Sequence, residues 1–410
     1  MRILHVLDFI IYWSIIIMPF SVAIAPAIAN TFIGLFSGAF LISKLLKKEP
    51  ILINKTILLS FTCLIIISLL SFVNSVNYNS SIQGIVKLLK YLLIFAVCSQ
   101  AIKDKGHIKK IVFSVCCGVS LSAIDALWQF LFGYDFIHRI ALHHNIGIPR
   151  VSAAFPNPNL LGIYMSAFIP LVAGLAILYF KGKNKALMSF LTILALVGMF
   201  LTFSRGAGLA VYLAILFLCI AGRKKLLISA LVAVILIFPF VMPKDIKKWA
   251  KEVNYNPIVF MLNQDRISIY NNTINMIKHH PFIGVGVNTF SLNYGKYKTE
   301  SAEKYAHTPD TIYSHDIYLQ MAGEIGLLGL AVFFWFLFLI FKNAVSCYIK
   351  LDDEYLKAIS LSLVAGLVAF LINGLTETSL YNARVAMVFW YLIGISLSLN
   401  GFVKKPHNNS

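Results

Sequence analysis

The sequence predicts an all-α integral membrane protein with about twelve transmembrane helices. Hydrophobic residues make up 59% of the chain, and its mean hydropathy is +0.80. Apolar runs of about 20 residues recur along the chain, and short clusters of lysine and arginine separate them. A soluble protein of 410 residues has no way to hide so much apolar surface from water. Because lipid offers no hydrogen bonds to the backbone, helices are the expected form.

The lengths of the apolar runs give the number of crossings. An α-helix rises about 1.5 Å per residue and the hydrocarbon core is about 30 Å thick, so one crossing needs roughly 20 residues. The run at 186–221 is too long for one crossing and right for two short ones, with a break near Gly206 and Gly208. The predicted spans are 8–26, 29–45, 55–73, 84–102, 110–132, 158–180, 186–203, 207–221, 225–242, 316–341, 356–375 and 384–402.

The first two spans have a competing interpretation. Residues 9–43 are interrupted near Pro19, Pro26 and Asn30, which favours two helices, but the AIAPAIA motif is also compatible with a cleaved signal peptide. The positive region that precedes a signal peptide is weak here, since it holds only Arg2. Two membrane helices are therefore the preferred interpretation.

The distribution of basic residues predicts the orientation. With the N-terminus inside, the inner segments contain 20 of the 35 lysines and arginines, whereas the short outer loops at 74–83 and 376–383 contain none. This asymmetry follows the positive-inside rule and places both termini in the cytoplasm. The formal net charge of +18 is thereby explained by topology, and no nucleic-acid partner is expected. The domains we expect are a nine-helix region at 1–242, a large periplasmic loop at 243–314, and a three-helix region with a cytoplasmic tail at 315–410.

Three polar features converge on the predicted outer face. Arg205 is the only charge in its long apolar run and falls at the outer turn. Arg266 begins an amphipathic pattern that includes Ile269 and ends before Pro281, followed by a glycine-rich turn. His315 stands at the mouth of the tenth span. There we expect Ser314 as the N-cap and Asp316 in the first turn, where the helix dipole favours an acid.

Each feature alone also has a structural interpretation. Arginines at span ends anchor helices at the interface, and a histidine at a helix start often only forms hydrogen bonds. Together they suit a specific anionic ligand, because arginine binds phosphate bidentately and histidine takes up a proton near neutral pH. No Asp-x-Asp pair is visible and the six cysteines show no metal-ligand spacing. We therefore expect no metal and no cofactor, with arginines stabilising the charge of a departing pyrophosphate.

At these residues the sequence resembles the O-antigen ligase and polymerase superfamily of bacterial membrane glycosyltransferases. Four stretches carry the resemblance, and the first hundred residues match only in hydropathy. These stretches are RVSAAFPNPNLLGIYM (150–165), LTFSRGAGLAV (201–211), RISIYNNTINMIKHHPFIGVGVNTF (266–290) and SHDIYLQMAGEIGLLGL (314–330).

The resemblance implies a metal-independent, inverting enzyme of the bacterial inner membrane. Its donor is a glycan linked to undecaprenyl pyrophosphate at the periplasmic face, and its acceptor is a sugar of the lipid A–core or another glycan. By motif position, Arg205 and Arg266 would hold the pyrophosphate and His315 would activate the acceptor hydroxyl. The family often has asparagine after this histidine. Here the residue is Asp316, which either acts on His315 or caps the helix.

Other residues are possible supports for this site. Lys87 and Lys90 lie on one face of the fourth span, where they either contact phosphate or extend to the interface. Asn159 belongs to the Pro-Asn-Pro-Asn turn before the sixth span. Asp125, isolated in the fifth span, is expected to pair within the bundle.

Two other functions stay open at this point. A polymerase of the same superfamily differs only in its acceptor, which one sequence does not decide. A lipid-linked glycan flippase or transporter also fits twelve spans. However, transporters usually show internal repeats and ionisable groups near the midplane, and neither is clear in this chain. O-antigen ligase is the preferred function.

Overall fold

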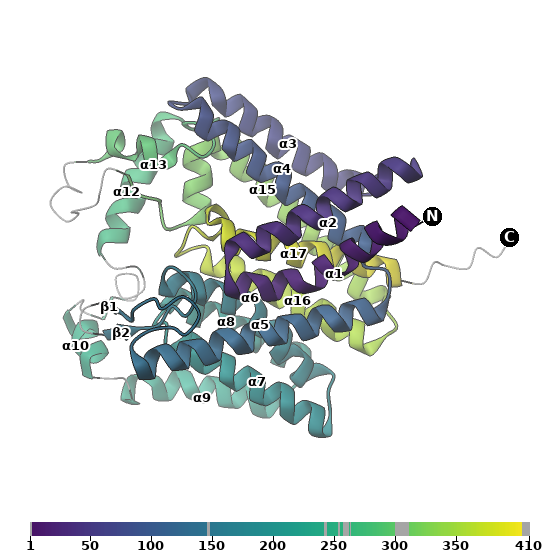
Figure 1. Ribbon diagram of the computed structural model, residues 1–410. Helices are drawn as coiled ribbons and strands as arrows, with labels where there is room; N and C mark the ends of the chain where they lie inside the picture. The colour runs from purple at the N-terminus through teal and green to yellow at the C-terminus, as the bar shows by residue number, and fades with distance from the viewer. Residues whose placement is uncertain are drawn as a thin grey trace.

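The computed structural model describes residues 2–145, 148–241, 244–252, 255, 256, 262, 264–299 and 311–403, and these residues are mostly helical (Figure 1). The long helices are α1 (Arg2–Ile24), α2 (Pro26–Lys47), α3 (Lys55–Leu70), α4 (Tyr78–Ala101), α5 (Lys105–Phe132), α6 (Pro158–Leu178), α7 (Gly182–Phe200), α8 (Arg205–Ala221), α9 (Lys225–Val241), α15 (Ile317–Lys350), α16 (Glu354–Asn373) and α17 (Ala383–Ser398).

Shorter elements connect these helices. They are the antiparallel strands β1 (His143–Asn145) and β2 (Ile148–Arg150), the helices α10 (Lys244–Glu252), α12 (Gln264–His279) and α13 (Phe290–Asn293), and the 3-10 helices η1 (Ser71–Asn74), η2 (Tyr294–Tyr297), η3 (Ser379–Tyr381) and η4 (Leu399–Phe402).

The predicted membrane fold is confirmed. Within the described residues, ten helices are long and apolar enough to cross a membrane, and each coincides with a predicted span. The remaining two predicted spans correspond to α8 and α9, which are shorter apolar helices. The number of twelve crossings therefore stays a prediction. Residues 300–310 of the predicted outer loop and 404–410 of the predicted tail lie outside the described part of the chain.

Local chemistry sets the helix boundaries. The first long apolar run is broken at Ala25, where Pro26 opens α2 with a residue that needs no helical N–H partner. The side chain of Asn157 accepts a hydrogen bond from the amide of Leu160 and so caps α6. Because Asn157 takes the capping role, Asn159 in the first turn is left to bind elsewhere.

Helices α6, α16 and α17 form the centre of the molecule. In the most apolar stretch of α6, 94% of the residues are buried, whereas in that of α7 only 17% are. Helix α16 packs against α6 and α8, and α17 packs against α4. The periphery exposes large apolar side chains, as expected for a surface that faces lipid.

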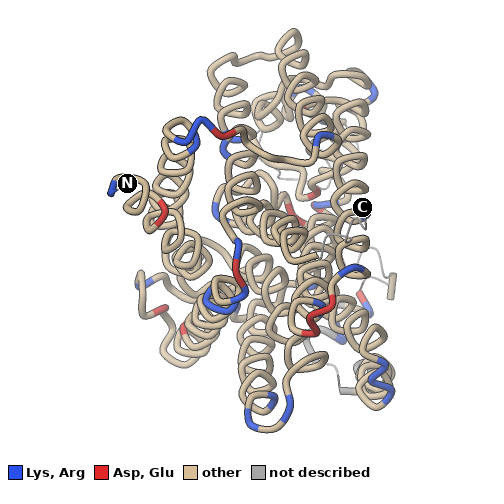
Figure 2. The backbone as a smooth tube through the Cα atoms, turned by 90° about the vertical axis from the view of Figure 1, so that its right-hand side faces the viewer, with Lys and Arg blue, Asp and Glu red and all other residues tan. Residues whose placement is uncertain are grey.

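The two ends of the helix bundle differ. In Figure 1, the start of α1 and the end of α17 lie on the right, whereas β1, β2, α12 and α13 lie on the left. In Figure 2, lysines, arginines and acids gather mainly at helix ends and in the connections between them. The start of α1 and the end of α17 thus lie on one side of the bundle, and the short connecting elements β1, β2, α12 and α13 lie on the other.

Helix α12 confirms the predicted helix that begins near Arg266 and ends before Pro281. Its buried face carries Ser268, Ile269, Asn272, Thr273 and Met276, and it packs on α15. Ile274, which the helical period places beside this face, is 41% exposed, so the contact with α15 buries a narrower face than the apolar pattern predicts.

Candidate active site

Arg205 lies where the sequence predicts, at the turn between two short apolar helices. Helix α7 ends at Phe200 and α8 begins at Arg205. Gly206 follows, and a Cβ there would lie 2.0 Å from Oγ1 of Thr376. Only glycine therefore lets the first turn of α8 approach the loop between α16 and α17 so closely. This contact brings Arg205 to the loop that carries Glu377.

Arg266 reaches the same loop from α12. Its guanidinium donates to the backbone carbonyl of Thr376 and forms an ion pair with the carboxylate of Glu377. Both side chains are largely buried, with 16% of Arg266 and 12% of Glu377 exposed. The planar guanidinium binds these two acceptors through two separate nitrogens in a fixed geometry, whereas an ammonium group presents all its donors from one nitrogen.

His315 contacts Glu377 from the opposite side of the carboxylate. Its Nδ1 lies 3.3 Å from Oε2 of Glu377, and 31% of the imidazole side chain is exposed. The single O–H of Tyr270 lies 3.1 and 2.9 Å from the carbonyls of His315 and Leu375, which share its proton. The tyrosine thus ties together the backbones of the two segments that carry the histidine and the acid.

The start of α15 differs from the prediction. Asp316, not Ser314, is the N-cap, since its carboxylate accepts from the amides of Tyr318 and Leu319 at 2.7 and 2.8 Å. Ser314 instead closes a small turn, in which its hydroxyl contacts the backbone of Asp316. Both residues are good caps. The amide of Ile317 also bonds to the carbonyl of Gly374, which helps to fix where the helix begins.

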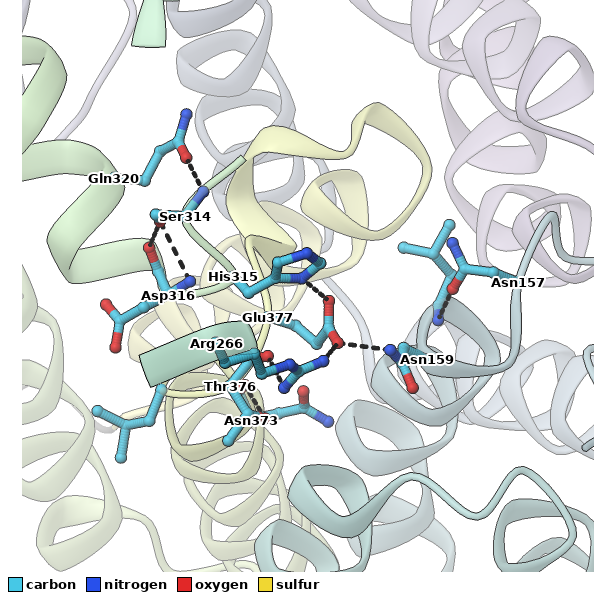
Figure 3. Close-up of polar contacts among 12 residues, drawn as sticks. Asn157, Asn159, Arg266, Ser314, His315, Asp316, Gln320, Asn373, Thr376 and Glu377 are labelled. Carbon is cyan, nitrogen blue, oxygen red and sulfur yellow. Dashed lines mark hydrogen bonds and ion pairs between the residues drawn. The ribbon is translucent and has the colours of Figure 1, made fainter. Parts of the chain in front are cut away.

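Asp316 has a structural role in this geometry. In Figure 3 its carboxylate points away from Glu377, and the acid in contact with His315 is Glu377. Burial raises the pKa of Asp316 to about 6, although the two amides it caps pull the pKa down. Of the two roles that the sequence left open for Asp316, helix capping is the one with a direct contact.

Asn159 joins the cluster as a bridge. Its amide donates to Oε1 of Glu377, and its carbonyl oxygen accepts from Arg150 at 2.6 Å. Arg150 ends β2 and also donates to the carbonyl of Thr202 at 2.8 Å, just before Arg205. Figure 3 shows Asn159, Arg266 and His315 converging on Glu377 from three separate elements.

The electrostatics of the cluster favour an anionic ligand. Burial opposes ionisation of Glu377, but His315 and Arg266 outweigh it and hold the pKa of this carboxyl below its usual value. Burial lowers the pKa of the Arg150 guanidinium, which Glu377 counteracts and Arg266 reinforces. Arg205 is within electrostatic reach of both Arg150 and Arg266. Three guanidinium groups thus lie within electrostatic reach of one another, and Glu377 is a partner of two of them, Arg266 and Arg150. These four residues together carry an excess of two positive charges.

Lys87 and Lys90 belong to other parts of the structure. The ammonium of Lys87 donates to the side chain of Asn288 at 2.9 Å, and that of Lys90 lies 3.5 Å from Asn30. Neither has a described contact with the cluster around Glu377. Asp125 accepts from the amide of Phe136 at 2.8 Å, so it does bind within the fold.

A second buried acid, Glu324 on α15, shares a partner with Lys87, since both contact Asn288. This carboxylate accepts from the amides of Asn288 and Phe290 at 2.6 and 3.3 Å and from Gln320 at 3.0 Å. It holds the glycine-rich turn, where Gly284 has a φ of +68° and packs on the backbone of Glu324. In the described part of the chain, no three His, Cys, Asp or Glu side chains are arranged to hold a metal ion.

Sequence reasoning missed Glu377, Arg150 and Tyr270 as parts of this site. The signal for Glu377 was available, because it is the only charged residue in the outer loop 376–383. Arg150 is the first residue of one of the four stretches that carry the resemblance, but the sequence alone assigns it no function in the site. Tyr270 lies one helical turn after Arg266, on the same side of α12.

Residues 190–334 match the family model of O-antigen ligases. This finding confirms the resemblance to the O-antigen ligase and polymerase superfamily, and the matched segment contains Arg205, Arg266 and His315. Asn159 and Glu377 lie outside it. No curated protein matches the chain significantly.

Proposed function

We propose that this protein, which carries a domain of the O-antigen ligase family, is an O-antigen ligase-type glycosyltransferase. It would transfer a glycan from undecaprenyl pyrophosphate to a sugar hydroxyl of the lipid A–core. The observation that carries the proposal is the convergence of His315 and Arg266 on Glu377, with Arg205 and Arg150 nearby. A histidine beside an excess of guanidinium groups suits a hydroxyl nucleophile and a pyrophosphate leaving group.

The reaction would proceed in one displacement. The acceptor oxygen forms a bond to the anomeric carbon as the bond from that carbon to the pyrophosphate oxygen breaks, so the anomeric configuration inverts. The proton of the acceptor hydroxyl passes to the His315 imidazole, and the electron pair of the broken bond leaves with the pyrophosphate. Glu377 is a poor candidate for the base. Its lowered pKa makes the carboxylate a weak proton acceptor, and its ion pair with Arg266 already engages one of its oxygens.

The arginines would stabilise the leaving group. Arg205 and Arg266 come from two elements that are far apart in the sequence, so they can approach a pyrophosphate from two directions. Their fixed charges are placed before the reaction and need no reorganisation as negative charge develops. In this proposal they supply the charge stabilisation that divalent ions supply in many pyrophosphate-releasing enzymes, and no cofactor is required.

We further propose that the site faces the periplasm of a bacterial inner membrane, with both termini in the cytoplasm. The support is the positive-inside distribution of lysines and the placement of α12 on the side opposite the chain ends (Figure 1). A cysteine at the exposed residue Asn271 of α12 should react with an impermeant thiol reagent in intact spheroplasts. A cysteine at exposed Lys183 should react only after lysis, and the reverse pattern would overturn the orientation.

The test of the reaction uses purified protein with lipid-linked donor and lipid A–core acceptor. General base catalysis contributes typically about 10²–10⁴-fold, so His315→Ala should reduce turnover by that factor while donor binding stays near wild type. His5→Ala, at an exposed position of α1, is the matched control and should behave as wild type. Wild-type turnover in His315→Ala would refute the base assignment.

Deletion of the gene distinguishes the acceptors. A ligase predicts loss of all polymer on the lipid core while long lipid-linked chains accumulate. Capping with single repeats would instead indicate a polymerase, and unmodified precursor trapped inside the cell would indicate a flippase.

A further inference from the structure

We propose that Glu377 is a positioning residue that fixes the tautomer and the orientation of His315, and thereby leaves the Nε2 atom to receive the proton of the acceptor. This inference rests on the proposed function, because it assigns the mechanism by which the base of that reaction is prepared. Glu377 itself does not contact the reacting atoms in this scheme; it acts through the histidine.

The tautomer follows from the hydrogen-bonding chemistry of the pair. An ionised carboxylate only accepts hydrogen bonds, and a neutral imidazole has one N–H and one acceptor nitrogen. Because Nδ1 of His315 lies 3.3 Å from Oε2 of Glu377, the proton of the neutral ring belongs on Nδ1. The lone pair is then on Nε2, which is the atom available to act as a base.

The carboxylate is itself held firmly enough to orient a ring. Its Oε1 atom accepts hydrogen bonds from Arg266 and Asn159, which leaves Oε2 to contact His315. The loop that carries it is tied down at the carbonyls of Gly374, Leu375 and Thr376 by Ile317, Tyr270 and Arg266. Since the same Tyr270 hydroxyl also binds the carbonyl of His315, the acid and the histidine are held in a common frame.

Glu377 also fits the charge that the reaction creates. When His315 takes the proton of the acceptor it becomes a cation, and the neighbouring guanidinium groups oppose that cation. A carboxylate in direct contact offsets this repulsion at the moment of proton transfer. The same arrangement of acid, imidazole and nucleophile operates in serine proteases, where a change of the acid to its amide lowers turnover by about 10⁴-fold.

Two structural alternatives give different results. Glu377 could serve only as the counter-ion that folds Arg266 into place, in which case its loss would damage the donor site. It could also be the base itself, in which case its effect would not depend on His315. Each alternative predicts a distinct pattern in kinetics.

The kinetic experiment compares Glu377→Gln, His315→Ala and the double variant, with Glu49→Gln as the matched control. Glu49 is paired with Lys44 and its side chain is 54% exposed. For Glu377→Gln we expect turnover at saturating substrates to fall by about 10²–10⁴-fold, with folding intact and donor binding unchanged or tighter. Binding does not weaken because the amide removes a negative charge from beside Arg266. In the His315→Ala background, Glu377→Gln should cause no further loss.

The second readout is independent of glycan transfer. Protein labelled with ¹⁵N in its ten histidines, with the His315→Ala spectrum subtracted, reports which ring nitrogen of neutral His315 carries the proton. Wild type should show the proton on Nδ1, and Glu377→Gln should show a mixture, because an amide both donates and accepts.

These measurements separate the two levels of the proposal. Full turnover in Glu377→Gln, equal loss of turnover and donor binding, an undiminished effect in the His315→Ala background, or a proton on Nε2 in wild type would each overturn the role of Glu377. A wild-type protein that shows the Nδ1 tautomer but transfers no glycan would instead refute the proposed reaction.

Discussion

Two buried glutamates, Glu324 and Glu377, are held in contrasting ways. Glu324 is 1% exposed and accepts from two backbone amides and one glutamine. The side chain of Glu377 is 12% exposed and contacts an arginine, a histidine and an asparagine from three different elements. Glu324 is thus bound mainly by backbone amides, which keep their charge. Glu377 is bound mainly by side chains that can also bind a ligand or a proton.

The comparison separates a structural acid from one suited to a reaction. Backbone amides cannot leave or change charge, so Glu324 keeps the glycine-rich turn fixed on α15. Arginine and histidine side chains have further N–H groups or a proton-accepting nitrogen with which to contact a pyrophosphate or an acceptor. Burial alone does not distinguish the two acids, whereas the identity of their hydrogen-bond donors does.

The largest effect is expected from Arg266→Lys and Arg205→Lys. Lysine keeps the charge but loses the planar fork, with which Arg266 holds Thr376 and Glu377 at once. We expect transfer to fall at least about 100-fold, comparable to the removal of a preorganised donor in other enzymes, with normal protein levels in the membrane. Arg2→Lys, in an exposed position of α1, is the control. Near-normal transfer would reduce both arginines to structural anchors.

Glu324→Ala should have the opposite profile to Glu377→Gln. The buried amide of Phe290 and the partly buried amide of Asn288 would lose their acceptor, and an unsatisfied buried group costs about 1–3 kcal/mol. We expect a clear fall of the apparent Tm in detergent, while turnover per folded molecule stays within about three-fold of wild type, since each 1.4 kcal/mol of lost transition-state stabilisation is about ten-fold. A strong loss of turnover at an unchanged Tm would place Glu324 in the reaction and remove the contrast.

Asn159→Ala should give an intermediate effect on turnover. The bridge between Glu377 and Arg150 would be lost, and hydrogen bonds to charged groups contribute about 1.5–3 kcal/mol. Because Arg266 still holds Glu377, we expect a loss of only about ten-fold. Asn159→Asp should lose more than the alanine variant, since the carboxylate cannot donate to Glu377, pairs with Arg150 and so reduces the positive charge available to an anionic ligand. Equal turnover in the two variants would argue against this electrostatic account.

The smallest effect is expected for Lys87→Met. Lys87 contacts Asn288 on the side of Glu324, and no described contact links it to the cluster around Glu377. Methionine preserves much of its apolar stem, so transfer should stay within about two-fold of wild type, which corresponds to less than 0.5 kcal/mol. A fall in transfer of ten-fold or more would instead support the interpretation of Lys87 as a phosphate ligand.

The sequence was sufficient for the helices because their cause is local. Apolar length predicts a crossing, and Pro26 and Asn157 mark helix starts. The break predicted near Gly206 and Gly208 instead lies at 201–204, just before Arg205, and both glycines are within α8. The start of α15 was placed too early because Ser314 and Asp316 both have good capping side chains. A contact from Ile317 to Gly374 joins two distant segments there, and no local pattern reports it.

The site was only partly predictable for the same reason. Arg205, Arg266 and His315 were visible because each interrupts an apolar or amphipathic pattern. Glu377 meets His315 across 62 positions and Asn159 across 218. No repeat or spacing encodes such a meeting, which arises from how α16 packs beside α6 and α8.

The position of Glu377 in the chain has a consequence for biosynthesis. During translation the segments that carry Arg205, Arg266 and His315 emerge first, and Glu377 emerges only after α16 is complete. A nascent or truncated chain that ends before this loop lacks the carboxylate that Arg266 and His315 both contact. The cluster therefore assembles late, after nearly the whole polypeptide has been made, and in the proposed reaction an incomplete chain lacks the residue that positions His315.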